Sequence, residues 1–492
     1  MSLRSTSSSS SMHERRWLIL AVLGIAQLMV VLDATIVNIA LPSAQQSLGF
    51  SDDSRQWVVT AYALAFGSLL LLGGRIGDLF GRKRALIIGL LGFAVASALA
   101  GFAQNFEMLV AGRALQGAFG ALLAPAALSL LTTTFTDPAE RGRAFGIYGA
   151  IAGGGAAVGL LLGGVLTEYL DWRSTLFVNL IFAVPAALAA FVLLVNQRPA
   201  VRPKLDVPGT LTATFGLFAL VYGFASAETN GWSASITVAS LALGAVLLIA
   251  FVVLQARGKH PLLPLRVVTD RDRGGAYVAM GLAGAGMFGV FLFLTFYLQR
   301  TLGFSPLESG LAFLPLTAAI MVTATVVSTR ILPRTGPRPL IPTGMLLAGL
   351  AMLLLTRVGV DTGYADHVLP ALLLTGVGMG LIFAPAMATA TGGVAAGDAG
   401  VASAMVNTSQ QIGGSIGTAL LSTLSATSAS TYVAGHGGPS REVLAAAAVH
   451  GYTTAFWWSA AIFMVGAVVT GALLRSGAQE LDPAAAEPAF AH

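Results

Sequence analysis

The chain has no cysteine and very little charge. Only 10% of its 492 residues are Asp, Glu, Lys or Arg, whereas 55% are hydrophobic, and soluble proteins of ordinary composition carry about 25% charged residues. A large soluble core does not explain this difference, because single cores stop growing at about 250–300 residues. The chain is therefore expected to face a solvent other than water. The lack of cysteine also excludes disulfides and thiolate metal sites.

Signatures of enzyme chemistry are missing as well. There is no GxxxxGK[ST] phosphate loop for ATP, the six histidines are scattered without metal-ligand spacing, and no catalytic triad pattern is present. The net charge of +5 is compatible with nucleic-acid binding, but the basic residues lie in short segments between apolar runs, as in membrane proteins with basic inner loops. We therefore expect no enzyme activity, no cofactor or metal, and no nucleic-acid partner.

Long apolar runs are abundant. A helix needs about 20 apolar residues to cross a bilayer, and the first run is too long to be the core of a cleaved signal peptide. The fourteen runs are centred on residues 17–40, 57–77, 85–104, 108–135, 143–169, 174–196, 208–227, 236–256, 275–299, 308–331, 339–357, 367–390, 400–427 and 449–474. They predict an all-α integral membrane protein.

The basic residues predict the topology of these spans. With fourteen spans both termini lie on one side; if that side is the cytoplasm, 20 of the 27 Lys and Arg residues fall in inner segments and five in outer segments. The positive-inside rule predicts this bias. We expect a multi-pass protein of a bacterial plasma membrane with both termini in the cytoplasm.

The sequence also repeats itself. GALLAPA at 120–126 returns as GLIFAPA at 380–386, an offset of 260, and Gly159 returns as Gly417, an offset of 258. This indicates two six-helix halves of the same orientation, which is a transporter architecture. The expected organisation is a disordered cytoplasmic N-terminus 1–16, a six-helix bundle 17–200, a two-helix insertion 201–257, a six-helix bundle 258–476 and a disordered cytoplasmic tail 477–492.

Of the 22 acidic residues, Asp33 is the one that lies well inside a predicted span. An ionised Asp at a helix centre costs about 2.5–3.5 kcal/mol, unless it takes up a proton or meets a cation. Arg113 is the candidate partner, because it lies about 9 Å below the outer end of its span and Asp33 lies about 12 Å below its own. The alternatives are that Asp33 is only a structural polar residue and that Arg113 snorkels outward alone.

Two glycine-rich segments suggest close helix contacts. In GGRIGDLFGRKRAL at 73–86 the glycines allow a tight reversal, Asp78 can cap a helix or pair with an arginine, and the basic residues can anchor at headgroups. The alternative is a topological anchor and nothing more. Gly155, Gly159 and Gly163 form a stripe that lets another backbone come close, as static packing or as a sliding surface.

These motifs resemble those of the major facilitator superfamily, specifically its fourteen-helix drug:proton antiporter branch. The resemblance covers about 17–474 and includes LDATIVNIALP at 32–42, GGRIGDLFGRK at 73–83, RALQGAFGA at 113–121, GAAVGLLLGG at 155–164 and DWRSTLFVN at 171–179. Two positions depart from the family pattern. Leu79 stands where a basic residue is usual, and Leu160 stands where Pro usually follows the glycine.

The resemblance implies two six-helix bundles with two extra central helices, and assigns roles by motif. The residues concerned are Asp33 and Arg113 for proton coupling; Gly74, Asp78, Gly81 and Arg82 for a cytoplasmic latch; and Gly155, Gly159, Gly163 and Gly164 for the antiporter motif. Independently of the resemblance, polar residues within the spans are candidates for lining a substrate cavity: Asn38, Gln116, Tyr297, Asn407 and Gln410. The alternative is that they bond to neighbouring helices.

The function implied is export of amphipathic or cationic drugs, or of toxic metabolites, in exchange for protons by alternating access. The proton-motive force is the energy source, protons and membrane lipids are the partners, and a monomer is expected to suffice. The alternatives are an exporter of one metabolite such as a self-made antibiotic, a lipid flippase, and a non-transporting membrane sensor. Arg outnumbers Lys 24 to 3, which hints at a GC-rich genome and favours the dedicated exporter among these alternatives.

Overall fold

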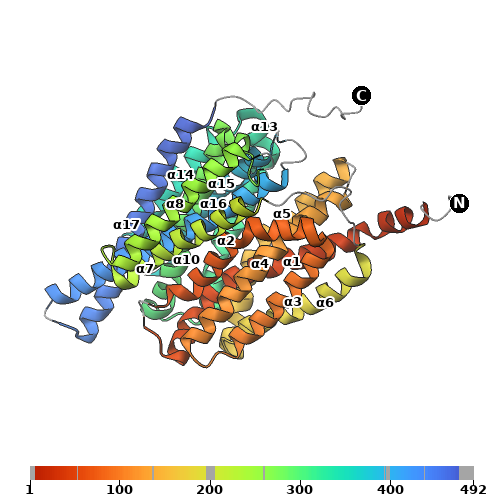
Figure 1. Cartoon of the computed structure of the whole chain (residues 1–492). Coiled ribbons are helices and arrows are strands. Elements are labelled where there is room, and N and C mark those ends of the chain that lie inside the picture. Colours follow the sequence, from red (N-terminus) through yellow and green to blue (C-terminus); the bar gives the residue numbers. More distant parts are fainter. Residues whose placement is uncertain are drawn as a thin grey trace. The chain divides into compact units, whose positions relative to one another are not determined.

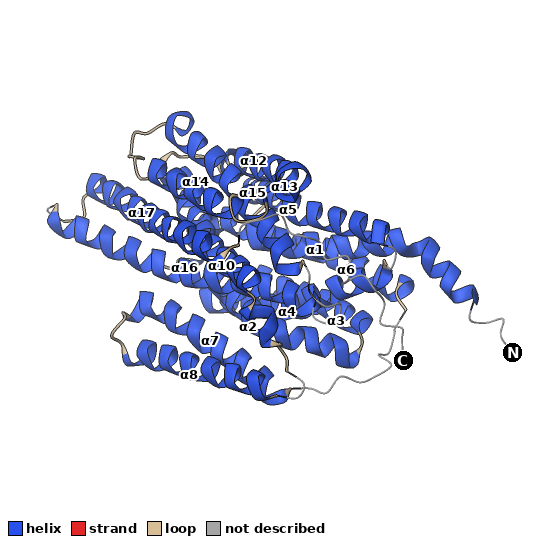
Figure 2. Ribbon diagram, turned by 90° about the horizontal axis from the view of Figure 1, so that it is seen from above, coloured by secondary structure: helices blue, strands red, loops and turns tan. Residues whose placement is uncertain are grey.

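The structure is a computed structural model that describes residues 6–51, 54–135, 138–195, 206–258, 261–392, 394, 399–436 and 438–475. Every regular element within these ranges is a helix (Figures 1 and 2). The longer helices are α1 (Thr6–Leu48), α2 (Gln56–Phe80), α3 (Arg82–Gly101), α4 (Phe106–Thr134), α5 (Pro138–Tyr169), α6 (Ser174–Leu193), α7 (Val207–Asn230), α8 (Ser235–Arg257), α10 (Arg271–Phe296), α12 (Leu314–Val326), α14 (Leu340–Leu355), α15 (Leu369–Thr391), α16 (Ala399–Gly435) and α17 (Arg441–Leu473). The prediction of an all-α membrane protein is confirmed.

Short elements join or extend these helices. They are α9 (Leu265–Thr269), α11 (Pro306–Ala312), α13 (Leu332–Thr335) and the π-helical turns η1 (Tyr297–Thr301), η2 (Val327–Ile331) and η3 (Tyr364–Val368). Each of the fourteen apolar runs is helical over most of its described residues. Eleven helices of the described residues are long and apolar enough to cross a membrane, and α5 and α14 contribute the shorter apolar stretches Val158–Tyr169 and Leu340–Leu355.

The helix ends depart from the sequence-based ranges. Residues 6–16, expected to be disordered, continue α1, and at this end Arg16 Nη2 lies 2.5 Å from Glu140 Oε1 of α5. Helix α16 continues to Gly435, past the end of its predicted range at residue 427. Helix α17 begins at Arg441, before the start of its predicted range at residue 449. An established helix propagates at little cost, so polar residues at its end need not stop it. The expected disordered tail 477–492 lies outside the described residues.

The chain forms two compact units, one of residues 1–210 with 305–311, and one of residues 211–304 with 312–492. In the first unit α4 packs on α2, α3 and α1, and both α5 and α6 pack on α1. In the second unit α15 packs on α12, α14 and α10, and both α16 and α17 pack on α10. The two sets of neighbours match helix for helix, which is what a repeat of six helices predicts.

Glycines mark the closest approaches in both units. A Cβ on Gly159 would lie 2.1 Å from Thr35 Oγ1 and 3.1 Å from the Leu32 carbonyl oxygen of α1. A Cβ on Gly417 would lie 2.4 Å from the Ala285 Cα of α10. The two glycines related by the offset of 258 thus hold equivalent contacts between equivalent helices. The glycine stripe therefore does bring two backbones together, as small residues do at membrane helix interfaces.

Helices α7 and α8 form the expected two-helix insertion. A Cβ on Gly244 would lie 2.7 Å from the Leu220 amide nitrogen, so the two helices touch backbone to backbone. Near the link between them the buried hydroxyls of Ser226 and Thr237 share a hydrogen bond of 3.1 Å. This pair satisfies two polar groups inside an apolar hairpin.

We predict that Gly413→Ala destabilises the protein by about 1–3 kcal/mol, because overpacking forces the backbone apart. A Cβ at Gly413 would lie 1.8 Å from the Gly281 carbonyl oxygen, and backbone atoms cannot rotate away. Gly435→Ala is the matched control on the same helix, because nothing lies within 4 Å of its Cβ position. Thermal unfolding in detergent measures both variants; equal unfolding temperatures would contradict the packing described.

Candidate functional site

Asp33 lies at the centre of a buried polar network in the first unit. Its side chain is 0% exposed, and its Oδ2 accepts a hydrogen bond of 2.5 Å from Arg113 Nη1. Its Oδ1 accepts hydrogen bonds from Gln116 Nε2 at 2.9 Å and from Asn179 Nδ2 at 2.8 Å. The carboxylate of α1 is thus held by a cation and an amide of α4 and by an amide of α6.

Arg113 has further partners around it. Its Nε donates to the Val58 carbonyl oxygen of α2 at 3.1 Å, and its Nη1 also donates to Gln116 Oε1 at 2.9 Å. Its guanidinium carbon lies 4.5 Å from the centre of the Tyr62 ring, a cation–π contact. With 1% exposure Arg113 does not snorkel outward. The network reaches α3 through Gln116 Nε2, which donates to Ser97 Oγ at 2.7 Å.

In this arrangement the Asp33 carboxylate is the acceptor in each of the three hydrogen bonds described above. An ionised carboxylate only accepts hydrogen bonds, whereas a protonated one also donates. Oδ1 accepts two of the three hydrogen bonds, so a proton bound to Oδ1 would displace one of them. The titratable side chains facing Asp33 within the network are Arg113 of α4 and Tyr62 of α2. A proton on Oδ1 would therefore change a contact that α1 makes with α4 or with α6.

Two polar atoms of the network have no partner among the described residues. They are the Tyr62 hydroxyl and Asn179 Oδ1, both buried. Buried polar groups are nearly always hydrogen-bonded, to ordered water where no protein group is available. These two atoms therefore mark places where water can enter the network.

Sequence reasoning identified Asp33, Arg113 and Gln116 but not Ser97, Tyr62 or Asn179. Asn179 is the last residue of the DWRSTLFVN motif, so its motif was noticed without a role for the residue. These three side chains are neutral. Burial of a neutral polar residue costs less free energy than burial of a charge, so its presence in an apolar run does not by itself indicate a site. Ser97 lies on α3, Tyr62 on α2 and Asn179 on α6, and the packing of these three helices brings the side chains into the network.

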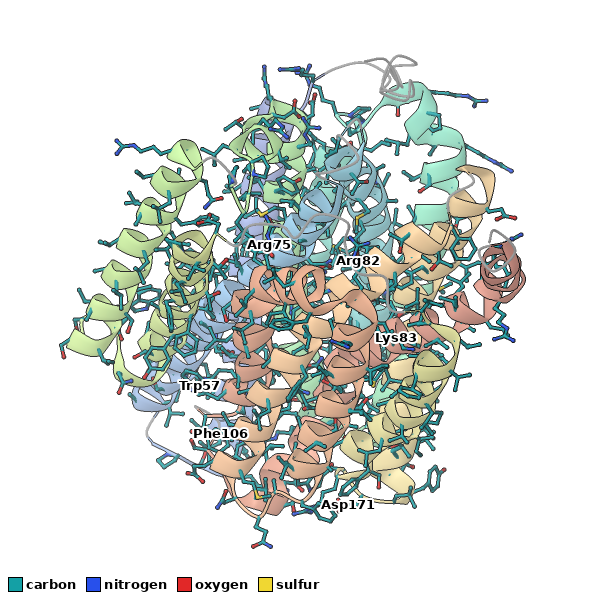
Figure 3. All side chains as sticks on the ribbon, turned by 45° about the vertical axis from the view of Figure 1, so that its right-hand side comes forward. Trp57, Arg75, Arg82, Lys83, Phe106 and Asp171 are labelled. Carbon is teal, nitrogen blue, oxygen red and sulfur yellow. The ribbon has the colours of Figure 1, made fainter. Side chains whose placement is uncertain are left out.

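The loop between α2 and α3 makes the predicted tight reversal. Gly81 alone separates the two helices and has a φ of 100°, a conformation that favours glycine. Lys83 Nζ donates to the carbonyl oxygens of Phe191 and Leu194 at 2.7 and 2.6 Å, so it caps the C-terminus of α6. Figure 3 shows Arg82 at the opposite end of this unit from Phe106 and Asp171. The Asp78 side chain lies outside the described part of the structure.

The other predicted site residues are more scattered. Gly74 faces Pro125 of α4 with its Cβ position 3.6 Å away, and Gly164 faces the backbone of Leu307, one of the residues 305–311 that belong to this unit. Asn38 is 4% exposed and donates to the Ala34 carbonyl oxygen of its own helix at 3.1 Å. None of these three lies among the partners of Asp33 described above.

Three proposed cavity residues belong to the second unit. The Tyr297 hydroxyl donates to the Gly359 carbonyl oxygen at 2.9 Å, which ties η1 to the loop after α14. Asn407 and Gln410 are half-buried on α16. Their role in substrate binding stays a prediction. No group of three or more His, Asp or Glu side chains in the described residues is arranged to hold a metal ion.

The sequence matches one family model and several known proteins. The family model described as Major Facilitator Superfamily matches residues 23–418. The chain is 51% identical over 470 residues to the puromycin resistance protein pur8 of Streptomyces alboniger, which covers 95% of this chain and 93% of that protein. It is 39% identical over 402 residues to the cephamycin export protein CmcT of Amycolatopsis lactamdurans, which covers 81% of this chain and 83% of that protein.

A solved structure supports the fold alone. The POT family transporter PepTSo superposes with a TM-score of 0.69 at 14% identity, over 92% of this chain and 97% of that one.

We predict strong coupling between Asp33 and Arg113 in a double-mutant cycle. Arg113→Met leaves a buried carboxylate without its cation and is expected to cost about 3–5 kcal/mol. Adding Asp33→Asn is expected to recover part of this loss, because the amide carries no charge.

Thermal unfolding in detergent measures the cycle. Arg84→Met, which removes an exposed guanidinium, is the matched control. Additive effects of the two substitutions would show that the contact contributes nothing to stability.

Proposed function

Because the chain belongs to the major facilitator superfamily of membrane transporters, we propose that it is an efflux antiporter that exports amphipathic antibiotics in exchange for protons. The observation that carries the proposal is the buried Asp33 carboxylate, bonded to Arg113, Gln116 and Asn179. Intramembrane acids mark ion and proton pathways in transporters. Among the described residues Asp33 is the acid that lies fully buried.

The names of the relatives support the direction and the substrate class. One is a resistance protein for puromycin and the other exports cephamycin, and both compounds are antibiotics. Resistance by a transporter of this family is explained most simply by export. The identity of 51% over nearly the whole chain makes an antibiotic the first substrate to test.

The driving energy is sufficient for uphill export. One proton charge that crosses 100 mV releases about 2.3 kcal/mol, and a pH gradient adds to it. In the proposed cycle Asp33 is protonated from the outside, which frees it from part of its network and favours drug release. It loses the proton to the inside, which restores the network and favours drug capture. The basic inner segments place both termini in the cytoplasm in this scheme.

A second candidate is an exporter of one antibiotic only. Both relatives are named for a single antibiotic or antibiotic class, and the Arg-rich composition fits a GC-rich producer genome. Resistance profiling of a drug-hypersensitive host separates the two candidates. Protection against several unrelated amphipathic drugs supports the general antiporter, and protection against one compound supports the dedicated exporter.

We predict that Asp33→Asn abolishes uphill transport of puromycin in proteoliposomes energised by a proton gradient, because an amide cannot carry the proton. Wild-type protein treated with an uncoupler is expected to behave the same way. The control is Glu107→Gln, which makes the same chemical change at an exposed site. Accumulation by Asp33→Asn at the wild-type level would overturn the proposed coupling.

A further inference from the structure

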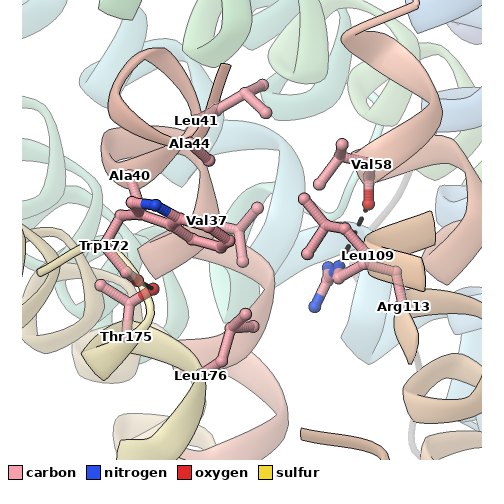
Figure 4. A pocket seen from close by; sticks show the side chains of 10 residues that line it. All are labelled: Val37, Ala40, Leu41, Ala44, Val58, Leu109, Arg113, Trp172, Thr175 and Leu176. Atoms are coloured by element: carbon pink, nitrogen blue, oxygen red, sulfur yellow. Dashed lines mark hydrogen bonds between the residues drawn. The ribbon is translucent and has the colours of Figure 1, made fainter. Parts of the chain in front are cut away.

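A narrow cavity lies beside the Asp33–Arg113 network, and Arg113 forms one end of it (Figure 4). Its lining residues on α1, among them Val37, Ala40 and Ala44, follow Asp33 in the chain, and Leu109 on α4 precedes Arg113. Because α1 and α4 run in opposite directions, the cavity extends from the network toward the end of the bundle where α5 connects to α6. Trp172 of that connection also lines the cavity.

Trp172 borders this space on the side of the connection. The side chain is 3% exposed, and Figure 4 shows its ring lying across α1 beside Ala40. Its indole Nε1 is buried and has no hydrogen-bond partner among the described residues. An indole N–H left unsatisfied in this way costs about 1–3 kcal/mol, so this position of the ring is not held by a hydrogen bond of its nitrogen.

Neighbouring residues hold Trp172 in place. The Arg173 guanidinium carbon lies 4.4 Å from the indole ring centre, and its Nη2 donates to the Ala103 carbonyl oxygen at 3.1 Å. Its Nη1 lies 3.4 Å from Ser47 Oγ near the end of α1. Thr175 Oγ1 donates to the Trp172 carbonyl oxygen at 2.6 Å. The α5–α6 connection is thus tied to the ends of α1 and α3, with the indole beneath the guanidinium.

We propose that Trp172 seals an access route through which water and protons reach the Asp33–Arg113 network, and that Arg173 positions this seal. The inference rests on the proposed function, since it supplies the outer path for the proton that Asp33 takes up. The step is a simple transfer, in which hydronium gives its proton to the Asp33 carboxylate and leaves as water. The charged group at the inner end is Arg113, and the lining contributed by α1, α2 and α6 is uncharged.

The route is too narrow for a chain of water molecules in this structure. The volume open to a water molecule is about 10 Å³, close to the least that holds one water, and the wall is almost entirely apolar. A chain of waters cannot form in this space. Displacement of the indole would join the cavity to the solvent at the connection, so the position of Trp172 decides whether protons reach the network from this side.

The cysteine-free sequence allows a direct test by accessibility. Single cysteines at Ala44 and Val37 probe the two depths of the cavity, and Ala96→Cys on α3 is a buried control that does not line it. The probe is Ag⁺, a thiophilic ion of about the size of water, applied to the protein in liposomes. Trp172→Ala is expected to raise the Ag⁺ reaction rate at Val37→Cys about tenfold, which corresponds to an activation free energy lower by about 1.4 kcal/mol. The rate at Ala96→Cys is expected to stay unchanged.

Two aromatic variants separate a seal from ordinary packing. Trp172→Phe is expected to keep the low rate, because a ring still fills the site. Phe177→Ala removes a ring from α6 that packs on Gly101 and Phe102 of α3 without lining the cavity, and is expected to leave the rate unchanged. If Trp172→Ala does not fold, Arg173→Gln, which loosens the indole, is expected to raise the rate in the same direction.

The proposal is overturned if Val37→Cys reacts at the same rate with and without Trp172, or if Ala96→Cys and the Phe177→Ala background change as much. A second readout is the pH dependence of puromycin export, which an open seal is expected to shift and a packing defect is not. The Ag⁺ rate needs no transport activity. Puromycin transport by Asp33→Asn therefore tests the proposed function, and the Ag⁺ reaction rate tests the access route separately.

Discussion

The buried pair of Asp33 and Arg113 is the interaction on which the first unit depends. One carboxylate from α1 binds two residues of α4 and one of α6, and the guanidinium in turn binds the backbone of α2. Charges are expensive at this depth, so the pair persists only because each member satisfies the other and the remaining hydrogen bonds are made. In the proposed cycle, a proton added to Asp33 alters the contacts among these helices and so links a local chemical event to their packing.

The two units share a packing plan but not this pair. Leu32 of α1 faces Gly159 and Ala285 of α10 faces the equivalent Gly417, so Gly286 takes the place in α10 that Asp33 has in α1. A Cβ on Gly286 would lie 2.3 Å from the Phe463 ring of α17. An aromatic ring thus packs at the position equivalent to the carboxylate. No charged side chain in the described part of the second unit is buried. The two units therefore share their helix packing, whereas the buried ion pair belongs to the first unit.

The sequence predicted those contacts whose residues cost much free energy to bury or to pack closely. An acid in an apolar run, a cation at equal depth and glycines repeated at a constant offset all led to contacts that the structure contains. The neutral partners Ser97, Tyr62 and Asn179 were not found, because nothing in the local sequence distinguishes them from polar residues that bond to their own helix, as Asn38 does. The π-helical turns also escaped prediction, because hydropathy does not distinguish them from α-helix. The extended ends of α16 and α17 escaped it because an established helix propagates through polar residues that hydropathy leaves outside the span.

The most direct test of the central claim, that Asp33 exchanges a proton in step with substrate binding, is proton release on addition of puromycin to the purified protein in weakly buffered detergent solution. The account predicts release of up to about one proton per wild-type molecule, because drug capture favours ionised Asp33 and linkage between the two ligands is reciprocal. It predicts no release from Asp33→Asn that still binds the drug. Equal release from both proteins would show that another group carries the proton and would contradict the account.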